Sequence, residues 1–242
     1  MCFHVLNRAV ARLTLFEKDE DYDAFERVLE EAVARERLPI LAYTVMPNHW
    51  HVVVRPETDS QLSKFFRWLT HTHTMRWHAH YHTEETGHLY QGRFKTFPIE
   101  ADDHLLTVLR YVERNPLRAA LCERAEDWRF GSFWRRKHGS PEQQQILSEW
   151  PITRPRQWVA LVNRPQSDAE LTALRNSVRK GTPYGVPERF DFPGSLQRGS
   201  FVVEVRSCAA DAGTVQPETC QQRKMVRRLS DRRERVVQSV HA

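Results

Sequence analysis

Two strongly apolar segments separated by one Pro-Asn turn constrain the fold of this chain more than any other feature. The segments are PILAYTVM (Pro39–Met46) and HWHVVVRP (His49–Pro56), and both are rich in β-branched and aromatic residues. That composition favours strands. With Pro47 and Asn48 between them, the two segments predict a β-hairpin.

The remaining periodic segments surround this hairpin in a regular order. Strand patterns are predicted at Cys2–Arg8 and Gly92–Glu100. Helical patterns are predicted at about Asp19–Arg37, from Asp59 or Ser60 to about His82, and from Asp102 or Asp103 onward. The order β-α-β-β-α-β followed by a helix is typical of an α+β, ferredoxin-like antiparallel sheet with its helices on one face.

The chain is expected to divide into three parts. Residues 1–137 form the main domain, onto which the Trp-rich segment Glu126–Arg136 packs back. Residues 138–185 form a basic segment with one helix at about Asp168–Lys180, because prolines recur from residue 141 onward. Residues 186–242 are expected to be a poorly ordered basic extension.

Composition narrows the class of protein. The 242 residues include 36 Lys and Arg against 31 Asp and Glu, a net charge of +5 that fits an anionic partner such as nucleic acid. No apolar run approaches the roughly 18 residues of a membrane span, so no membrane association is expected. The N-terminus has no signal-peptide pattern, and the four cysteines lie far apart without a CxxC pair. These features predict a cytoplasmic protein.

The HWH triplet carries the first chemical signal. In a strand, His49 and His51 point to one face while Trp50 points to the other. Two co-facing imidazoles form half of a divalent metal site, although two histidines on an open sheet face would look the same. Val53 takes the third position of an HxHxH pattern, and no P-loop is present. Both points argue against nucleotide-hydrolase chemistry.

The helix within LLTVLRYVERNPLRAAL (Leu105–Leu121) carries the second signal. Tyr111 lies on the flank of its apolar stripe, and Asn115 follows one turn later. Three arginines at four-residue intervals are predicted to form a basic ridge beside Tyr111: Arg110, Arg114 and Arg118. In the alternative interpretation, Tyr111 is an ordinary half-buried tyrosine, Asn115 caps a new helix that starts at Pro116, and the arginines are solvated.

Together with HWH, this helix suits one reaction, the attack of a tyrosine on a DNA phosphate. A tyrosine hydroxyl is a weak nucleophile at neutral pH, and a metal held by two histidines would stabilise the transition state. Further phosphate contacts are expected from Arg8, at the end of the first strand, and from Arg93 and Lys95. The last two residues share one face of the predicted strand Gly92–Glu100, although a solvated edge would look the same.

Four motifs carry a family resemblance. They are FHVLNRA near the start, YTVMPNHWHVVVRP (Tyr43–Pro56), LYQGRFK (Leu89–Lys95) and RYVERNPLRAALCERAEDWRFGSF (Arg110–Phe133). Over about residues 1–137 the chain resembles the single-tyrosine transposases of the HUH endonucleases, and more closely the REP-associated tyrosine transposases. LTALRNSVRKGTPYG (Leu171–Gly185) resembles the basic C-terminal segment of long members, and the resemblance stops after Gly185.

The resemblance implies a ferredoxin-like fold and a Mg²⁺- or Mn²⁺-dependent enzyme that nicks and rejoins single-stranded DNA. It implies Tyr111 as the nucleophile that becomes linked to the 5′ phosphate. His49 and His51 become metal ligands, and Asn115 a third ligand. The implied partners are REP-like palindromes that fold into hairpins, bound by a monomer or a homodimer.

Two other functions stay open on the sequence. One is a hairpin-DNA-binding module on the same fold without turnover. The other is a metal-dependent phosphohydrolase that uses His49 and His51 without Tyr111.

Overall fold

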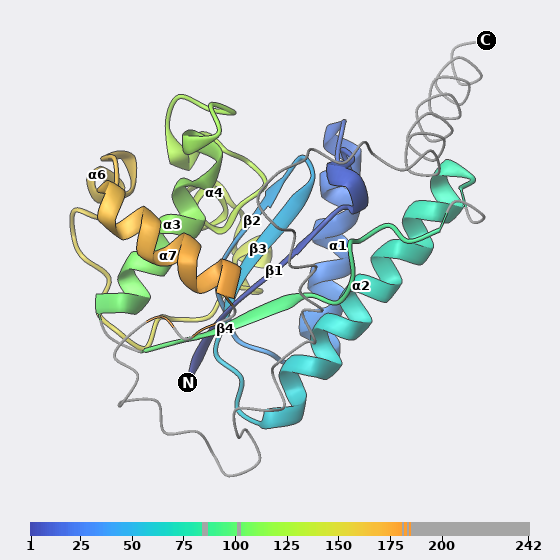
Figure 1. Cartoon of the computed structure of the whole chain (residues 1–242), viewed down its shortest axis with the longest axis horizontal. Helices are drawn as coiled ribbons and strands as arrows, with labels where there is room; N and C mark the ends of the chain where they lie inside the picture. Colours follow the sequence, from blue (N-terminus) through green and yellow to red (C-terminus); the bar gives the residue numbers. More distant parts are fainter. Residues whose placement is uncertain (84–86, 101–102, 181, 183, 185–242) are drawn as a thin grey trace, which may run out of the picture.

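A four-stranded antiparallel sheet forms the centre of the protein in the computed structural model (Figure 1). Its strands are β1 (Cys2–Arg8), β2 (Ile40–Met46), β3 (His49–Val54) and β4 (Lys95–Ile99), in the spatial order β2-β3-β1-β4. The predicted hairpin is β2–β3, with Met46 opposite His49 across the turn. This arrangement confirms the ferredoxin-like prediction. The structure describes residues 1–83, 87–100, 103–180, 182 and 184, so the expected extension over residues 186–242 lies outside the described residues.

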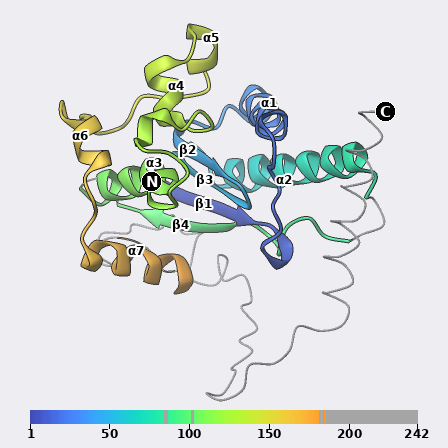
Figure 2. The ribbon, with the colours of Figure 1, turned by 90° about the horizontal axis from the view of Figure 1, so that it is seen from above.

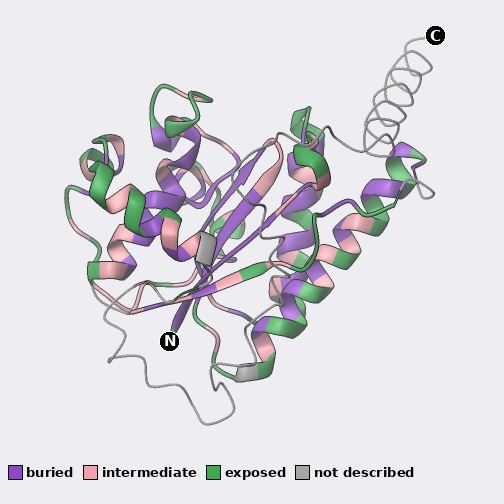
Figure 3. Ribbon diagram, viewed as in Figure 1, coloured by how far each residue is buried: buried purple, intermediate pink, exposed green. Residues whose placement is uncertain are grey.

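Two long helices cover one face of the sheet, as predicted. They are α1 (Asp19–Glu36) and α2 (Asp59–Tyr81), which lie together on one side of the strands (Figure 1). The inward sides of these two helices and nearly all of β1, β2 and β3 are buried, while the outward sides of the helices are exposed (Figure 3). The core between them includes Phe25, Leu29, Trp50, Phe65 and Phe66, all fully buried. Burial of such large apolar side chains is the main stabilising term in folding.

The opposite face of the sheet is covered by the later helices. These are α3 (Asp103–Arg118), α6 (Trp158–Asn163) and α7 (Asp168–Lys180). Figure 2 shows α7 on the opposite side of the sheet from α1. A second core lies here, in which Leu109 and Val112 of α3 pack with Val53 of the sheet and Trp158 of α6.

The Trp-rich segment packs back onto the free edge of the sheet, as predicted. The backbone N–H of Val45 in β2 donates to the carbonyl of Phe130 (2.9 Å), and the Trp128 indole N–H donates to the carbonyl of Val45 (3.0 Å). These bonds cover an edge strand that would otherwise expose unpaired backbone groups. The segment runs into α4 (Ser132–His138) and α5 (Pro141–Gln144). The described residues also form two short 3₁₀ helices, η1 (Val10–Arg12) and η3 (Ala125–Asp127).

Two expectations about elements are wrong. The last strand begins at Lys95 rather than Gly92, because Asn7 donates its side-chain amide to the Gly92 carbonyl (3.2 Å) and the chain bends there. Arg93 therefore lies before β4 and does not share a strand face with Lys95. The proline-rich region also forms more than the single predicted helix, since α5 and α6 precede α7.

None of the helices in the described ranges combines the length and apolar character that a membrane crossing needs.

Candidate active site

The two histidines of β3 lie together on the sheet face that α3 covers. The rings of His49 and His51 are 5.0 Å apart between centroids, as the strand prediction requires. Trp50 points to the other face, where it stacks on Phe66 and donates its indole N–H to the Tyr90 hydroxyl (3.1 Å). Packing of Trp50 into the core between the sheet and α2 therefore fixes the register that turns both imidazoles toward α3.

Tyr111 of α3 packs directly against this histidine pair. Its ring meets the His51 ring edge-on, with centroids 6.0 Å apart, and its side chain is 6% exposed. The helix crosses the sheet at this point because its apolar residues Leu109 and Val112 are buried against the same face. The structure thus brings a tyrosine and two histidines from distant parts of one chain into contact.

Asn115 and Arg118 extend the site along α3. The Arg118 guanidinium lies over the Tyr111 ring (4.5 Å) and is 3.4 Å from the Tyr111 hydroxyl, and it also donates to the side-chain oxygen of Asn115. The amide nitrogen of Asn115 is buried and finds no hydrogen-bond partner among the described residues. Because α3 runs unbroken through Asn115 and Pro116, the alternative that Asn115 caps a new helix is wrong.

A third histidine completes the cluster, and the sequence analysis missed it. His4 of β1 lies diagonally across from His51, with its Nε2 at 2.9 Å from the His51 Nδ1 and its ring stacked on that of His51. Its ring also meets Tyr111 edge-on at 6.2 Å. The sequence did contain a signal for His4. The alternation of side chains along the strand CFHVLNR places His4 on the same face as Arg8.

Burial keeps all three imidazoles uncharged at neutral pH. Loss of solvation lowers the pKa of His4 to about 3 and that of His49 to about 4; for His49 the charges of Arg8 and Arg118 add to the effect. The pKa of His51 is held well below its ordinary value by burial and then by the neighbouring histidines. Neutral imidazole is the form that binds metal ions.

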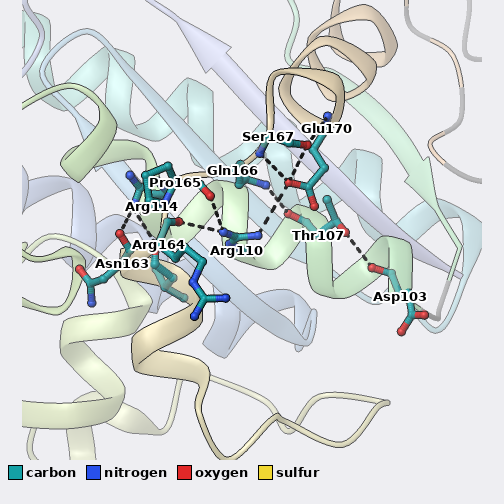
Figure 4. Close-up of polar contacts among 11 residues, drawn as sticks. Asp103, Thr107, Arg110, Arg114, Asn163, Arg164, Pro165, Gln166, Ser167 and Glu170 are labelled. Atoms are coloured by element: carbon teal, nitrogen blue, oxygen red, sulfur yellow. Dashed lines mark hydrogen bonds and ion pairs between the residues drawn. The ribbon is translucent and has the colours of Figure 1, made fainter.

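The prediction of one basic ridge on α3 is wrong, because Arg118 lies beside Tyr111 while Arg110 and Arg114 bond to backbone carbonyls of a later segment. Figure 4 shows Arg110 and Arg114 beside that segment. Arg110 donates to the carbonyls of Arg164 (2.8 Å) and Pro165 (3.0 Å), and Arg114 donates to those of Val162 (2.9 Å) and Asn163 (2.6 Å). Arg110 therefore anchors the segment between α6 and α7, and Arg114 anchors the last turn of α6. Arg118, on the site side of the helix, is the member of the ridge that lies beside Tyr111.

Two other predicted basic residues lie on the site face of the sheet. Arg8 pairs with His49 across β1 and β3, and Lys95 of β4 pairs with Leu6 of β1. Paired residues share a face, so both cations flank the histidine cluster. Arg93 is exposed in the bend that precedes β4.

The predicted metal-binding set consists of two imidazoles and one amide. Within the described ranges, no three His, Cys, Asp or Glu side chains converge to hold a metal ion. The two neutral imidazoles of His49 and His51 suit a divalent cation. The oxygen of Asn115 is a suitable third donor for Mg²⁺ or Mn²⁺ once Arg118 releases it.

Comparisons with known proteins show what the part of the chain that carries this arrangement is similar to. Residues 1–115, which contain the histidine pair, Tyr111 and Asn115, match the model of the IS200-like transposases. A search of curated proteins gives no match. Among solved structures, the chain is similar to a REP-associated tyrosine transposase bound to a REP hairpin. The two share 20% identity, 64% of this chain and 88% of that chain are covered, and the TM-score is 0.46.

A transposase candidate from Deinococcus radiodurans R1 is a second similar structure, at 18% identity and a TM-score of 0.35. The match covers 47% of this chain and 88% of that one. The family model confirms, over residues 1–115, the resemblance seen in the motifs. Residues 1–115, somewhat less than half of the chain, are similar to the IS200-like transposases.

Proposed function

We propose that this protein is a transposase that nicks and rejoins hairpin-forming single-stranded DNA, with Tyr111 as the nucleophile and a covalent 5′-phosphotyrosine as the intermediate. The observation that carries the proposal is the contact between the Tyr111 and His51 rings, whose centroids lie 6.0 Å apart within one chain. A scissile phosphate bound beside this contact would meet both the proposed nucleophile and the candidate metal ligands.

The proposed reaction exchanges one phosphate ester for another. The Tyr111 oxygen attacks the phosphorus and loses its proton to water, and a Tyr–O–P bond forms. The P–O3′ bond breaks, and the leaving 3′ oxygen takes up a proton to give a free 3′ hydroxyl. Because the phosphotyrosine is an ester as well, attack by a 3′ hydroxyl rejoins the strand without ATP.

Arg118 has two roles in this proposal. Its guanidinium, 3.4 Å from the Tyr111 hydroxyl, orients that hydroxyl and neutralises the incoming phosphate. Arg8 and Lys95, on the same sheet face, bind the phosphates that flank the cleaved one, and the exposed Arg93 binds DNA that leaves the site. Each contact of this kind releases counterions and makes binding depend on salt.

A divalent cation, Mg²⁺ or Mn²⁺, fits the neutral imidazoles of His49 and His51, with the Asn115 oxygen as third donor. When bound, such an ion stabilises negative charge on the non-bridging phosphate oxygen and polarises the leaving 3′ oxygen. Charge neutrality of both histidines at neutral pH supports this assignment.

The proposed substrate is a REP-like palindrome folded into a hairpin, and the proposed compartment is the cytoplasm. A DNA partner is supported by the family, and a similar solved structure contains a REP hairpin. Since Tyr111 and the histidines meet within one chain, a monomer suffices for the nick, and a homodimer is needed only if two hairpins are joined.

The test is a covalent-adduct assay. Wild-type protein, a hairpin oligonucleotide from the flanks of its own gene and Mg²⁺ or Mn²⁺ should give a protein–DNA band on a denaturing gel. Tyr111→Phe should give none. The matched control is Tyr22→Phe, since Tyr22 is also 6% exposed but lies on the other side of the sheet. An adduct in Tyr111→Phe would refute the assignment of the nucleophile.

One observation favours a second function, a hairpin-DNA-binding module without turnover. Arg118 donates a hydrogen bond to the side-chain oxygen of Asn115, so the proposed third metal ligand is already engaged. In this case the chain binds hairpins in a salt-dependent way, and no adduct forms with either metal. Release of product by Tyr111→Phe would instead indicate a phosphohydrolase that depends on His49 and His51.

A further inference from the structure

His4 is a buried histidine at the site that the proposed reaction leaves without a task. Its side chain is 2% exposed, and its ring is enclosed by the rings of His51, Phe97 and Tyr111. Burial of a polar ring costs free energy unless its nitrogens are bonded. The bond that His4 makes is to a candidate metal ligand, through its Nε2 to the Nδ1 of His51 at 2.9 Å.

In both candidate metal ligands, His49 and His51, the Nδ1 atom of the ring is hydrogen-bonded to a neighbouring side chain. The Nδ1 of His49 is bonded to the side-chain oxygen of Asn48 at 2.6 Å, and the Nδ1 of His51 is bonded to His4. The Asn48 amide nitrogen faces the carbonyl of Arg12 at 3.5 Å, which turns its oxygen toward His49. A histidine whose Nδ1–H donates to such an oxygen keeps its lone pair on Nε2, where a metal can bind.

We propose that His4 is a positioning residue that accepts the Nδ1–H of His51 and so presents the Nε2 lone pair of His51 to the metal. This inference rests on the proposed function, in which His51 is a ligand. It assigns the proton in the His4–His51 bond to His51 and the remaining ring proton of His4 to its own Nδ1. With the opposite assignment, His51 would carry its proton on Nε2 and could not bind a metal there.

The position of His4 links the ligand to the nucleophile. The His4 ring stacks on His51 at 5.0 Å and meets the edge of the Tyr111 ring at 6.2 Å. Since β1 is the strand between β3 and β4, it is fixed on both sides by hydrogen-bonded neighbours. A residue on such a strand holds a ligand more rigidly than a loop residue could.

Two substitutions separate the hydrogen bond from the volume of the ring. His4→Phe keeps an aromatic ring but removes the acceptor, while His4→Gln places an amide oxygen close to where Nε2 lies. We expect Mn²⁺, titrated by electron paramagnetic resonance, to bind His4→Phe roughly 10- to 100-fold more weakly than wild type. His4→Gln should restore affinity to within a few-fold.

His73→Phe is the matched control, because His73 is 4% exposed and also bonded to a neighbour, the Tyr90 hydroxyl at 2.8 Å. It lies on the other face of the sheet, so its loss should leave Mn²⁺ affinity unchanged. A purely structural role for His4 predicts that both Phe variants behave alike. Wild-type affinity in a folded His4→Phe protein would overturn the proposal.

A second measurement needs no metal and no activity. Long-range ¹H–¹⁵N spectra of the histidine rings report which nitrogen carries the proton, and His51→Gln identifies the signals of His51. We expect the His51 proton on Nδ1 in the metal-free wild type. A proton on Nε2 would overturn the role of His4. If the wild type binds no Mn²⁺, the metal in the proposed function fails, while the spectra still decide the role of His4.

Discussion

At the scale of single residues, the site depends on partners that are far apart in sequence. His49, His51, Tyr111 and Asn115 were recognisable because each lies in a local pattern, a strand alternation or a helical turn. His4 was not, because its partner His51 is 47 positions away and is reached only through the pairing of β1 with β3. Local periodicity shows which face a residue takes, but it does not show what lies across the sheet.

Arg118 is the residue whose replacement best separates DNA contact from metal binding. In Arg118→Met the side-chain length is kept and the charge is lost. Hairpin binding should weaken, and the slope of log affinity against log salt should decrease by about one, because one phosphate contact is lost. Mn²⁺ affinity should not fall, since Arg118 is no ligand and its loss frees the Asn115 oxygen.

Binding of a labelled hairpin at several salt concentrations measures this effect, and Arg67→Met on the exposed side of α2 is the control. An unchanged salt slope in Arg118→Met would show that Arg118 does not contact phosphate.

At the scale of elements, α3 connects the site to the C-terminal helices. Its buried stripe was predictable from the spacing of apolar residues, and so were the bounds of α1, α2 and α7 to within a few positions. The direction of its arginines was not, because Arg110 and Arg114 bind carbonyls that lie 48 to 55 positions away. Equal spacing on a helix does not imply equal surroundings.

Arg114→Met tests whether Arg114 stabilises the fold rather than binding DNA. Its guanidinium donates to the carbonyls of Val162 and Asn163, the last turn of α6. Loss of these charged hydrogen bonds should cost about 1–3 kcal/mol in the free energy of unfolding. Urea denaturation measures the loss. Hairpin affinity and the slope of log affinity against log salt should match those of the wild type, in contrast to Arg118→Met. A decreased slope in Arg114→Met would show that Arg114 does contact DNA phosphate.

At the scale of the whole molecule, two cores lie on the two faces of one sheet, and the site lies on the face shared with the C-terminal helices. Trp158, Val162 and Leu174 belong to the same core as Tyr111 and Val112. Residues beyond the family match therefore pack against the helix that carries Tyr111. The sequence predicted one helix in that region but not this packing, because short proline-bounded helices leave little periodicity.

Glu113 is the polar group on which this packing depends most. Its carboxylate is buried in α3 and accepts hydrogen bonds from the Trp158 indole N–H (2.6 Å) and the Ser132 hydroxyl (3.1 Å). Burial raises the pKa of Glu113 above its ordinary value of 4.5, and the bond from Trp158 opposes that rise. The folded state therefore binds more protons than the unfolded state just above pH 4.5, and this group destabilises the fold as pH rises.

Trp158→Phe removes the indole donor and keeps the apolar ring, so its cost should depend on pH. Well below pH 4.5, where Glu113 is protonated in both states, the loss should be about 1 kcal/mol in the free energy of unfolding. Toward pH 8 it should approach about 2–3 kcal/mol, because a bond to a charged acceptor is lost. Trp150→Phe is the control, since the Trp150 indole donates to the backbone carbonyl of Leu41 (2.9 Å), which does not titrate. Urea denaturation of both variants and the wild type, from about pH 3.5 to about pH 8, compares the two costs. If both costs show the same pH dependence, Glu113 is not the charged group that joins α6 to the helix of Tyr111.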